Sequence, residues 1–218
     1  PKQSVATLQI DQVSPQHNRA FLLLLEPEVI KPVAWKPEHH SAFETIFTWH
    51  SELAQKDRYT QIHLPNQLPT EIPRQFAGKR LITMIAGNKT AAHPLELYSE
   101  RLKSIKWFEA SSKDAFDLYG QGWGHVRIPW LKIKIPSSVV PGRRRQSYRG
   151  PVQSKHQTLC QYKFSLCYEN ATGIPGYISE KIFDAFFAGC VPIYWGAPDI
   201  QDYIPEDCFI DRCRFKSH

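Results

Sequence analysis

The sequence predicts an α/β protein built on a parallel β-sheet, and two observations carry this prediction. From about residue 78 onward, short apolar runs that suit buried strands alternate with amphipathic helical patterns. Residues 162–196 then combine a strand, a polar loop, a helix and a second strand in one continuous segment. Successive parallel strands need crossover connections of this kind, so the alternation favours a parallel sheet.

The first part of the chain shows fewer clear elements. Residues 21–25 are entirely apolar and predict a short strand, which leads into the sequence Glu26-Pro27-Glu28. Residues 42–54 carry several large apolar side chains and predict a short helix or a mixture of helix and strand.

Three prolines within residues 63–73 indicate an interdomain linker, and we place the domain boundary near Gly78. The chain then divides into residues 1–77 and residues 78–218. With 218 residues it has room for one complete domain and part of another. It begins at Pro1 without a Met and stops soon after a strand-like run, so we expect a piece of a longer protein.

The second part supplies most of the expected elements. Strands are predicted at residues 80–86, 116–119 and 208–211, and an amphipathic helix at residues 95–108. Residues 136–158 are expected to form a basic loop containing Pro and Gly, in which the arginines at 143–145 are typical of a solvated charge run.

Residues 162–196 are the most informative part of the sequence. The strand predicted at residues 163–168 ends in Glu169-Asn170, and Ser179 occupies the position of a helix N-cap. Glu180 and Lys181 then fall in the first turn of the helix. This arrangement brings the carboxyl end of a strand to a helix N-terminus, a place that favours anionic ligands in open α/β sheets. A phosphorylated ligand is therefore expected.

This segment resembles the donor-binding motif of the α1,3/α1,4-fucosyltransferases, in which a Tyr-Lys-Phe strand precedes Glu-Asn and then Tyr-x-Thr/Ser-Glu-Lys. The matching positions are Tyr162, Lys163, Phe164, Glu169, Asn170, Tyr177, Ser179, Glu180 and Lys181. The run at residues 191–196, Val-Pro-Ile-Tyr-Trp-Gly, is also similar to the bacterial members.

The resemblance implies a GT-B-like α/β enzyme that transfers fucose from GDP-fucose with inversion and requires no metal or other cofactor. On this interpretation, residues 78–218 form a Rossmann-like donor domain with a parallel sheet, which binds the GDP-sugar. Residues 1–77 form part of a second Rossmann-like domain, on the acceptor side, and the linker. The acceptor implied is a glycan containing N-acetylglucosamine or glucose, with an α1,3-type linkage.

Five residues of the motif are candidate donor-binding residues. Lys181 is expected to stabilise the leaving pyrophosphate, since a lysine in the first helical turn is mildly disfavoured by the helix dipole until an anion binds. Glu180 could hydrogen-bond hydroxyls of the sugar or ribose, and Tyr177 could contact the nucleotide. Glu169 and Asn170 could hold the fucose. The structural alternatives are a solvated lysine, a capping box for Glu180, loop fixation for Glu169 and Asn170, and a tyrosine packed under the loop.

Two arginines are further candidates for the pyrophosphate. The family has an arginine near the start of the first helix of the donor domain, but that position is not occupied by arginine here. Arg101, in the second turn of the predicted helix, is the preferred substitute. Arg149 lies shortly before the donor motif, and a planar guanidinium suits a pyrophosphate or a guanine edge.

Glu26 is the candidate general base, because the resemblance implies a Glu at the end of an acceptor-domain strand. Glu28 is a close rival. A carboxylate base works best when partial burial raises its pKa, and the flanking leucines make such burial plausible on the sequence. The alternative is a strand-end carboxylate in a salt bridge.

Charge and cysteine content set the wider context. The net charge of +6, from 27 Lys and Arg against 21 Asp and Glu, suits phosphate-bearing partners of several kinds. No apolar run is long enough to span a membrane. The five cysteines form no CxxC pair, and their odd number argues against a full disulfide framework. Cys167 and Cys190 lie in apolar runs and are expected to be reduced core residues, so metal ligation is not expected and a reducing cytoplasm is the simplest setting. Peripheral contact with the inner membrane, or a Golgi lumen in a eukaryote, remains compatible with the charge and the resemblance.

Three other functions stay open. The chain could belong to a glycosyltransferase that uses another nucleotide sugar, or it could be a truncated GDP-sugar-binding module without catalysis. A nucleic-acid-binding domain is suggested only by the basic loop, and the sequence contains no recognition motif for nucleic acid. We therefore expect no nucleic-acid partner.

Overall fold

The computed structural model describes residues 20–64, 66–112, 114–128, 133–140 and 145–216. The chain forms two compact units, Pro1–His63 and Leu64–His218. The units therefore divide before the proline-containing segment that we expected to be a linker. In the structure residues 64–73 belong to the second unit, where the backbone carbonyl of Pro73 lies against Gly189, just past the end of a helix.

The first unit contains a small parallel sheet of order β1-β2-β3. Its strands are β1 (Phe21–Leu24), β2 (Thr45–Thr48) and β3 (Tyr59–Gln61), and a short helix α1 (Pro37–His40) lies between the first two. Leu24, Phe43 and Ile46 form the buried core of the unit. The strand expected at the start of this unit is confirmed.

Of the two alternatives expected for residues 42–54, the short helix is wrong and the mixture of helix and strand is closer to the structure. The segment holds β2 and a short 3-10 turn, Leu53–Gln55. Ile46 and Thr48 are buried and the residues beside them are half-buried, which is the period-two pattern of a strand. Three of the four residues of β2 are β-branched, and such residues favour strands.

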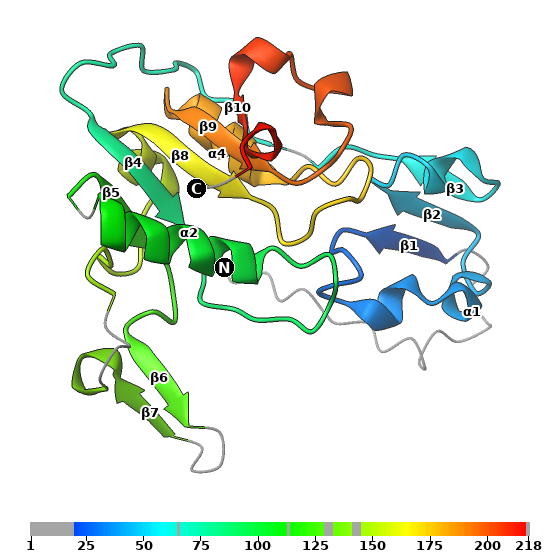
Figure 1. Cartoon of the computed structure of the whole chain (residues 1–218). Coiled ribbons are helices and arrows are strands. Elements are labelled where there is room, and N and C mark those ends of the chain that lie inside the picture. Colours follow the sequence, from blue (N-terminus) through cyan, green and yellow to red (C-terminus); the bar gives the residue numbers. More distant parts are fainter. Residues whose placement is uncertain (1–19, 65, 113, 129–132, 141–144, 217–218) are drawn as a thin grey trace. The chain divides into compact units, whose positions relative to one another are not determined.

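The second unit is built on a five-stranded sheet of order β10-β9-β8-β4-β5 (Figure 1). All four neighbouring pairs are parallel. The strands are β4 (Arg80–Ile85), β5 (Phe116–Tyr119), β8 (Tyr162–Tyr168), β9 (Val191–Trp195) and β10 (Ile210–Asp211). The helices are α2 (Tyr98–Ser111), α3 (Lys155–Leu159) and α4 (Glu180–Phe187). The predicted α/β class with a parallel sheet is confirmed.

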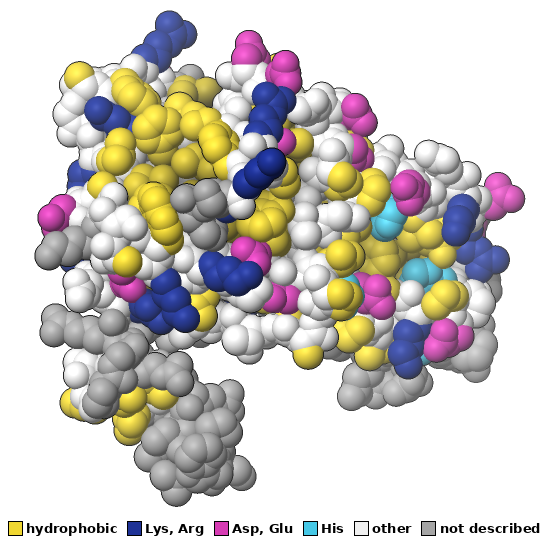
Figure 2. Space-filling view, viewed as in Figure 1, with side chains coloured by type: hydrophobic (Ala, Val, Ile, Leu, Met, Phe, Trp, Pro, Cys, Tyr) yellow, Lys and Arg dark blue, Asp and Glu magenta, His cyan; other side chains and the backbone are white. Residues whose placement is uncertain are grey.

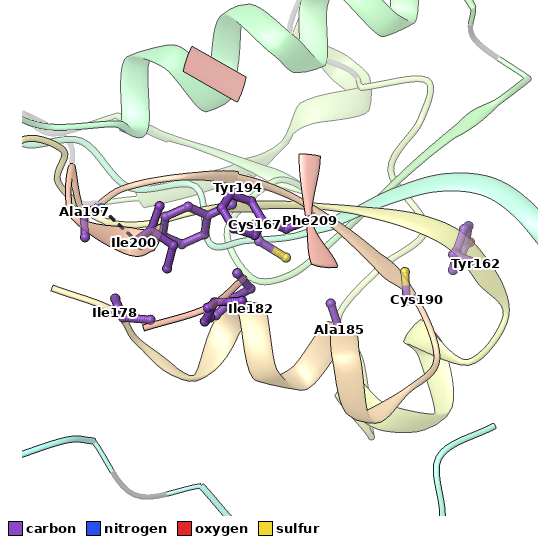
Figure 3. Packing of buried hydrophobic residues seen from close by; sticks show 11 residues of the cluster. Tyr162, Cys167, Ile178, Ile182, Ala185, Cys190, Tyr194, Ala197, Ile200 and Phe209 are labelled. Atoms are coloured by element: carbon purple, nitrogen blue, oxygen red, sulfur yellow. Dashed lines mark hydrogen bonds between the residues drawn. The ribbon is translucent and has the colours of Figure 1, made fainter. Parts of the chain in front are cut away.

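Side chains on the two faces of this sheet build two separate cores. On one face, Cys167 and Tyr194 pack against Ile182 and Ala185 of α4 (Figure 3). On the opposite face, Leu166 and other strand residues pack with Ile105 of α2. Figure 2 shows hydrophobic side chains gathered at the surface over the region of β4, β8 and β9.

The hairpin formed by residues 125–128 and 133–136 was not predicted from the sequence. β6 (His125–Ile128) and β7 (Ile133–Pro136) form an antiparallel hairpin, which Figure 1 shows projecting from the sheet. The basic loop expected at residues 136–158 lies partly outside the described residues, which exclude 141–144, and its later part includes α3. Arg145, by contrast, is paired with Glu109 at 3.0 Å and is not a solvated charge.

Two of the cysteines are core residues, as expected. Cys167 and Cys190 are buried and not disulfide-bonded, and burial raises the pKa of each thiol to about 12. Within the described residues, none of the helices combines the length and the apolar character that crossing a membrane requires.

Gly189, just past the end of α4, should not tolerate a side chain. Its φ is +61°, and a Cβ added there would meet the carbonyl of Pro73, with the carbonyl carbon at 3.0 Å. Gly78 has a similar φ of +78° and open space around it. We expect Gly78→Ala to lower the free energy of unfolding by about 1 kcal/mol, the strain of a left-handed residue. Gly189→Ala should cost a further 1–3 kcal/mol or so through overlap. Urea denaturation measures both, and equal losses would contradict the close approach of Pro73.

Candidate functional site

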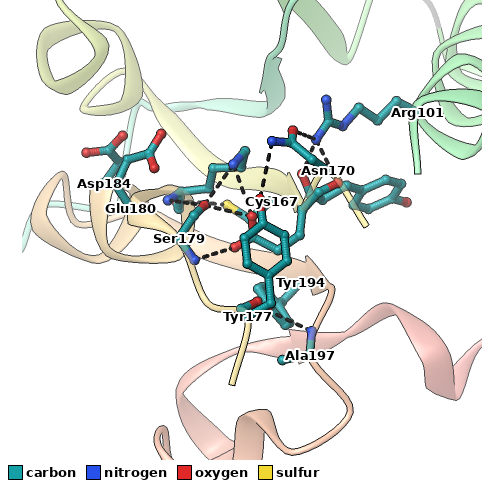
Figure 4. A network of polar contacts seen from close by, with 12 residues as sticks. Arg101, Cys167, Asn170, Tyr177, Ser179, Glu180, Asp184, Tyr194 and Ala197 are labelled. Carbon is teal, nitrogen blue, oxygen red and sulfur yellow. Dashed lines mark hydrogen bonds and ion pairs between the residues drawn. The ribbon is translucent and has the colours of Figure 1, made fainter. Parts of the chain in front are cut away.

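The centre of the site is the carboxylate of Glu169, the first residue after β8. The side chain is fully buried and accepts three hydrogen bonds. Figure 4 shows the polar network of this region, in which Ser179, Asn170 and Arg101 are labelled. The backbone N–H of Ser179 donates to one carboxylate oxygen at 2.8 Å, and the Ser179 hydroxyl donates to the other at 2.7 Å. The ammonium of Lys181 donates to that second oxygen at 3.0 Å. The end of β8 is thereby joined to the start of α4.

Ser179 is the N-cap of α4, as the sequence predicts. Its backbone is extended, and its hydroxyl oxygen accepts from the N–H of Lys181. The Lys181 ammonium also lies 2.7 Å from this hydroxyl oxygen. The lysine side chain is 24% exposed, so its charged end is held by protein groups yet reachable from solvent.

Arg101 of α2 lies on the other side of the strand end and is only 4% exposed. One guanidinium nitrogen donates to the backbone carbonyls of Tyr168 and Glu169, both at 2.7 Å, and to the side-chain oxygen of Asn170 at 3.0 Å. Burial lowers the pKa of Arg101, partly offset by Tyr98 and Glu169. In the structure this arginine holds the turn that follows β8.

Asn170 and Tyr177 continue the same network. The side-chain amide of Asn170 donates to the Tyr177 hydroxyl at 3.3 Å. Tyr177 is 2% exposed, and its backbone carbonyl accepts from the hydroxyl of Tyr194 at 3.4 Å. The structure thus brings Asn170 and Tyr177 together with Glu169 and Arg101, with the tyrosine ring packed beneath the loop. Nucleotide contact by Tyr177 stays a prediction.

Glu180 points to the surface at the first position of α4. Its carboxylate accepts from Lys155 of α3 at 3.1 Å, and the same ammonium pairs with Asp184 at 2.9 Å. Burial acts to raise the pKa of Glu180, but the charges of Lys181 and Lys155 hold it below its ordinary value. Glu180 is therefore an anionic acceptor beside Lys181, which is compatible with hydrogen bonds from ligand hydroxyls.

Arg149 belongs to a different cluster. It donates to the buried carboxylate of Asp117 at 2.6 Å, and Arg80 and the Tyr162 hydroxyl bind the second oxygen of that carboxylate at 2.5 and 2.7 Å. Arg80 and Tyr162 begin β4 and β8, whereas Glu169 follows the carboxyl end of β8. The structure does not bring Arg149 together with Lys181, and its role in donor binding stays a prediction.

Glu26 and Glu28 lie in the first unit, shortly after the end of β1. Both side chains are exposed, so the partial burial expected from the flanking leucines is not found in this unit. The indole N–H of Trp35 donates to the backbone carbonyl of Glu26 at 2.8 Å. The assignment of either carboxylate as the base stays a prediction.

The described residues include no cluster of three or more His, Cys, Asp or Glu side chains placed to hold a metal ion. The positive charge at the site comes from Lys181 and Arg101 and from the N-terminus of α4. The site therefore has the chemistry of an anion-binding site, with the carboxylates of Glu169 and Glu180 beside it.

Comparison with known proteins shows which family has this arrangement. The model of the family described as glycosyltransferase family 10 (fucosyltransferase) C-term matches residues 109–218, which is half of the chain and includes α4 and Lys181. The chain belongs to glycosyltransferase family 10. The predicted resemblance to fucosyltransferases is therefore confirmed.

Several relatives match shorter or longer parts of the chain. The α-(1,3)-fucosyltransferase FucT of Helicobacter pylori is 46% identical over 67 residues, 30% of this chain and 14% of that protein. The GDP-fucose protein O-fucosyltransferase 3 of Xenopus tropicalis is 42% identical over 165 residues, 74% of this chain and 31% of that protein. The human protein of the same name is 40% identical over 169 residues, 76% of this chain. The chain thus spans less than a third of these relatives' lengths.

A solved structure supports the fold. The crystal structure of an α1,3-fucosyltransferase with GDP-fucose superposes with a TM-score of 0.57 at 20% identity, covering 94% of this chain and 60% of that one. At this identity the likeness concerns the fold, and it confirms the GT-B-like, Rossmann-type class.

Two polar arrangements, one in the site and one outside it, were missed on the sequence. Ser179 was identified only as an N-cap, although its hydroxyl also joins Glu169 to Lys181. The Asp117 cluster was not predicted at all. A lone Asp inside the apolar strand run Phe-Asp-Leu-Tyr was the available signal, because a buried carboxylate requires charged or hydroxyl partners.

The charge pair between Glu180 and Lys155 can be tested by titration. Because the pKa of folded Glu180 is depressed, its contribution to stability is present near neutral pH and is lost as pH falls through that pKa. We expect Lys155→Met to raise the pKa of Glu180, measured by carbon NMR of the carboxyl group. Lys103→Met, which removes a lysine paired with Glu100, should leave it unchanged. An unaltered Glu180 titration in Lys155→Met would show that this ion pair is absent in solution.

Proposed function

We propose that the chain is part of an enzyme that transfers L-fucose from GDP-fucose to an acceptor hydroxyl with inversion. Membership of the fucosyltransferase family carries this proposal. The position of Lys181 supports it, since its ammonium is fixed in the first turn of α4 beside the end of a parallel strand. An anionic leaving group such as GDP is stabilised at such a place by the helix N-terminus and a neighbouring cation.

The proposed reaction is a direct displacement. The acceptor hydroxyl loses its proton to Glu26 and attacks the anomeric carbon from the face opposite GDP. The bond from the anomeric carbon to the β-phosphate oxygen breaks, and GDP departs with the electron pair. A β-linked donor then gives an α-linked product. We propose no metal cofactor, because Lys181 and the α4 N-terminus supply positive charge for the pyrophosphate.

Two acceptor classes have support. A glycan hydroxyl, with an α1,3-type linkage, follows from the motif and from the bacterial α-(1,3)-fucosyltransferase, which matches 30% of the chain. A protein hydroxyl is the second candidate. It is favoured by relatives named protein O-fucosyltransferase 3, which match about three quarters of the chain.

Lys181→Ala should weaken donor binding. Loss of a charge-assisted hydrogen bond of about 1.5–3 kcal/mol corresponds to roughly 10- to 150-fold in affinity. Calorimetric titration with GDP, GDP-fucose and GDP-mannose measures this and the sugar preference together. Lys103→Ala, on the surface of α2, is the matched control and should bind like the wild type. Unchanged GDP affinity in Lys181→Ala would refute the assignment of this lysine.

Glu26→Gln should abolish transfer while GDP affinity is kept. Removing a general base typically lowers the rate about 10²- to 10⁴-fold, whereas binding of the donor nucleotide does not require the base. The assay follows labelled fucose onto an oligosaccharide ending in N-acetylglucosamine and onto a folded protein with surface Ser and Thr, whose O-linked fucose is released by alkali. Glu28→Gln is the matched variant. Loss of transfer in Glu28→Gln alone would move the base to Glu28.

A further inference from the structure

Glu169 lies at the end of a strand, where carboxylates of α/β proteins often contact a ligand. In this structure its hydrogen-bond partners are protein groups. Its side chain is 0% exposed, and its two oxygens accept from the Ser179 N–H, the Ser179 hydroxyl and the Lys181 ammonium. We propose that Glu169 is a positioning residue, which sets the place of the Lys181 ammonium for the diphosphate and does not contact the sugar. This inference rests on the proposed function.

The surroundings of Glu169 close off a direct contact with a ligand. Gly196, which follows β9, packs so near that an added Cβ would lie 2.5 Å from the Cγ of Glu169. The backbone N–H of Glu169 donates to the carbonyl of Trp195 at 2.8 Å. Ser179 covers the carboxylate on the side of α4, and Arg101 holds the backbone carbonyl. Protein atoms therefore surround the carboxylate.

Lys181 has the opposite character. An ammonium has three N–H donors, and the contacts with Glu169 and Ser179 use two of them. The side chain is 24% exposed, so a donor can be offered to an oxygen of a ligand that arrives from solvent. A lysine side chain carries about 2 kcal/mol of rotamer entropy, and fixing it in advance removes that cost from binding.

The charge of Glu169 makes the proposal testable by the sign of an effect. If the carboxylate influenced ligand binding only through its charge, its removal would strengthen the binding of an anion. If it positions Lys181, removal should weaken binding, because the ammonium loses its anchor. If it hydrogen-bonds the fucose, only GDP-fucose and not GDP should be affected.

The chain contains a matched control. Glu109, near the end of α2, accepts from the N–H and the hydroxyl of Ser147 at 3.2 and 2.9 Å and from Arg145 at 3.0 Å. Glu169 has the same kinds of donor: the backbone N–H and the hydroxyl of one serine, and one cationic side chain. Its side chain is 12% exposed. Glu109→Gln therefore removes a similar carboxylate without touching Lys181.

The first experiment is a double-mutant cycle on the full chain, with GDP and GDP-fucose binding measured by calorimetry. We expect Glu169→Gln to weaken both ligands by the same factor, about tenfold. In the Lys181→Ala background the same change should add nothing. Glu109→Gln should bind like the wild type. Tighter binding, a loss confined to GDP-fucose, or an additive loss in the double variant would each overturn the proposal.

The second measurement needs no ligand and separates this proposal from the proposed function. Competitive acylation, read by mass spectrometry, should label Lys181 faster in Glu169→Gln than in the wild type, while Lys155 stays the same. Ser179→Ala removes one of the two partners of the ammonium and should also raise the acylation rate of Lys181. This variant replaces Glu169→Gln in the test if Glu169→Gln does not fold. An unchanged Lys181 rate in both variants would overturn the positioning role. Failure of the folded wild type to bind GDP would instead refute the proposed function.

Discussion

The buried carboxylate of Glu169 is the interaction on which the site depends. Taking a charged carboxylate out of water costs several kcal/mol, and this cost is offset only when donors of good geometry surround it. The donors come from Ser179 and Lys181, which start α4. The end of β8 and the start of α4 must therefore meet in one arrangement. Arg101 adds a third element, α2, through the backbone carbonyl of Glu169 itself.

The loop that links β8 to α4 is held by the same edge of the sheet. The carbonyl of Asn170 accepts from the N–H of Leu97, just before α2, and the N–H of Thr172 donates to Leu95. The Thr172 hydroxyl donates to the carbonyl of Gly196, past β9. These contacts place the segments that follow β4, β8 and β9 side by side, as expected at the carboxyl edge of a parallel sheet. The loop thus has little freedom to reorient the polar groups on it.

Sequence patterns were sufficient wherever the signal is local. The strands of the five-stranded sheet and the start of α4 followed from apolar runs and from the N-cap Ser179, because strand period and cap chemistry involve neighbouring residues. The partners of Arg101 could not be found in this way, since Tyr168 is 67 residues further along the chain. For residues 42–54 the sequence left a helix and a mixture of helix and strand open, because large apolar side chains suit either element. Pairing with β1 makes residues 45–48 a strand.

The distribution of charge explains why one lysine matters so much. Arg101 and Lys181 bring two positive charges to the strand end, and Glu169 brings one negative charge between them. Arg101 is 4% exposed and its nitrogen is committed to carbonyl oxygens, so its charge acts on the turn and not on solvent. Lys181 presents its ammonium to solvent at the helix N-terminus. The affinity for an anion at this place depends on the orientation of that ammonium. The carboxylate of Glu169, which the anion does not contact, sets this orientation. The most deeply buried charge of the site thereby controls its most accessible one.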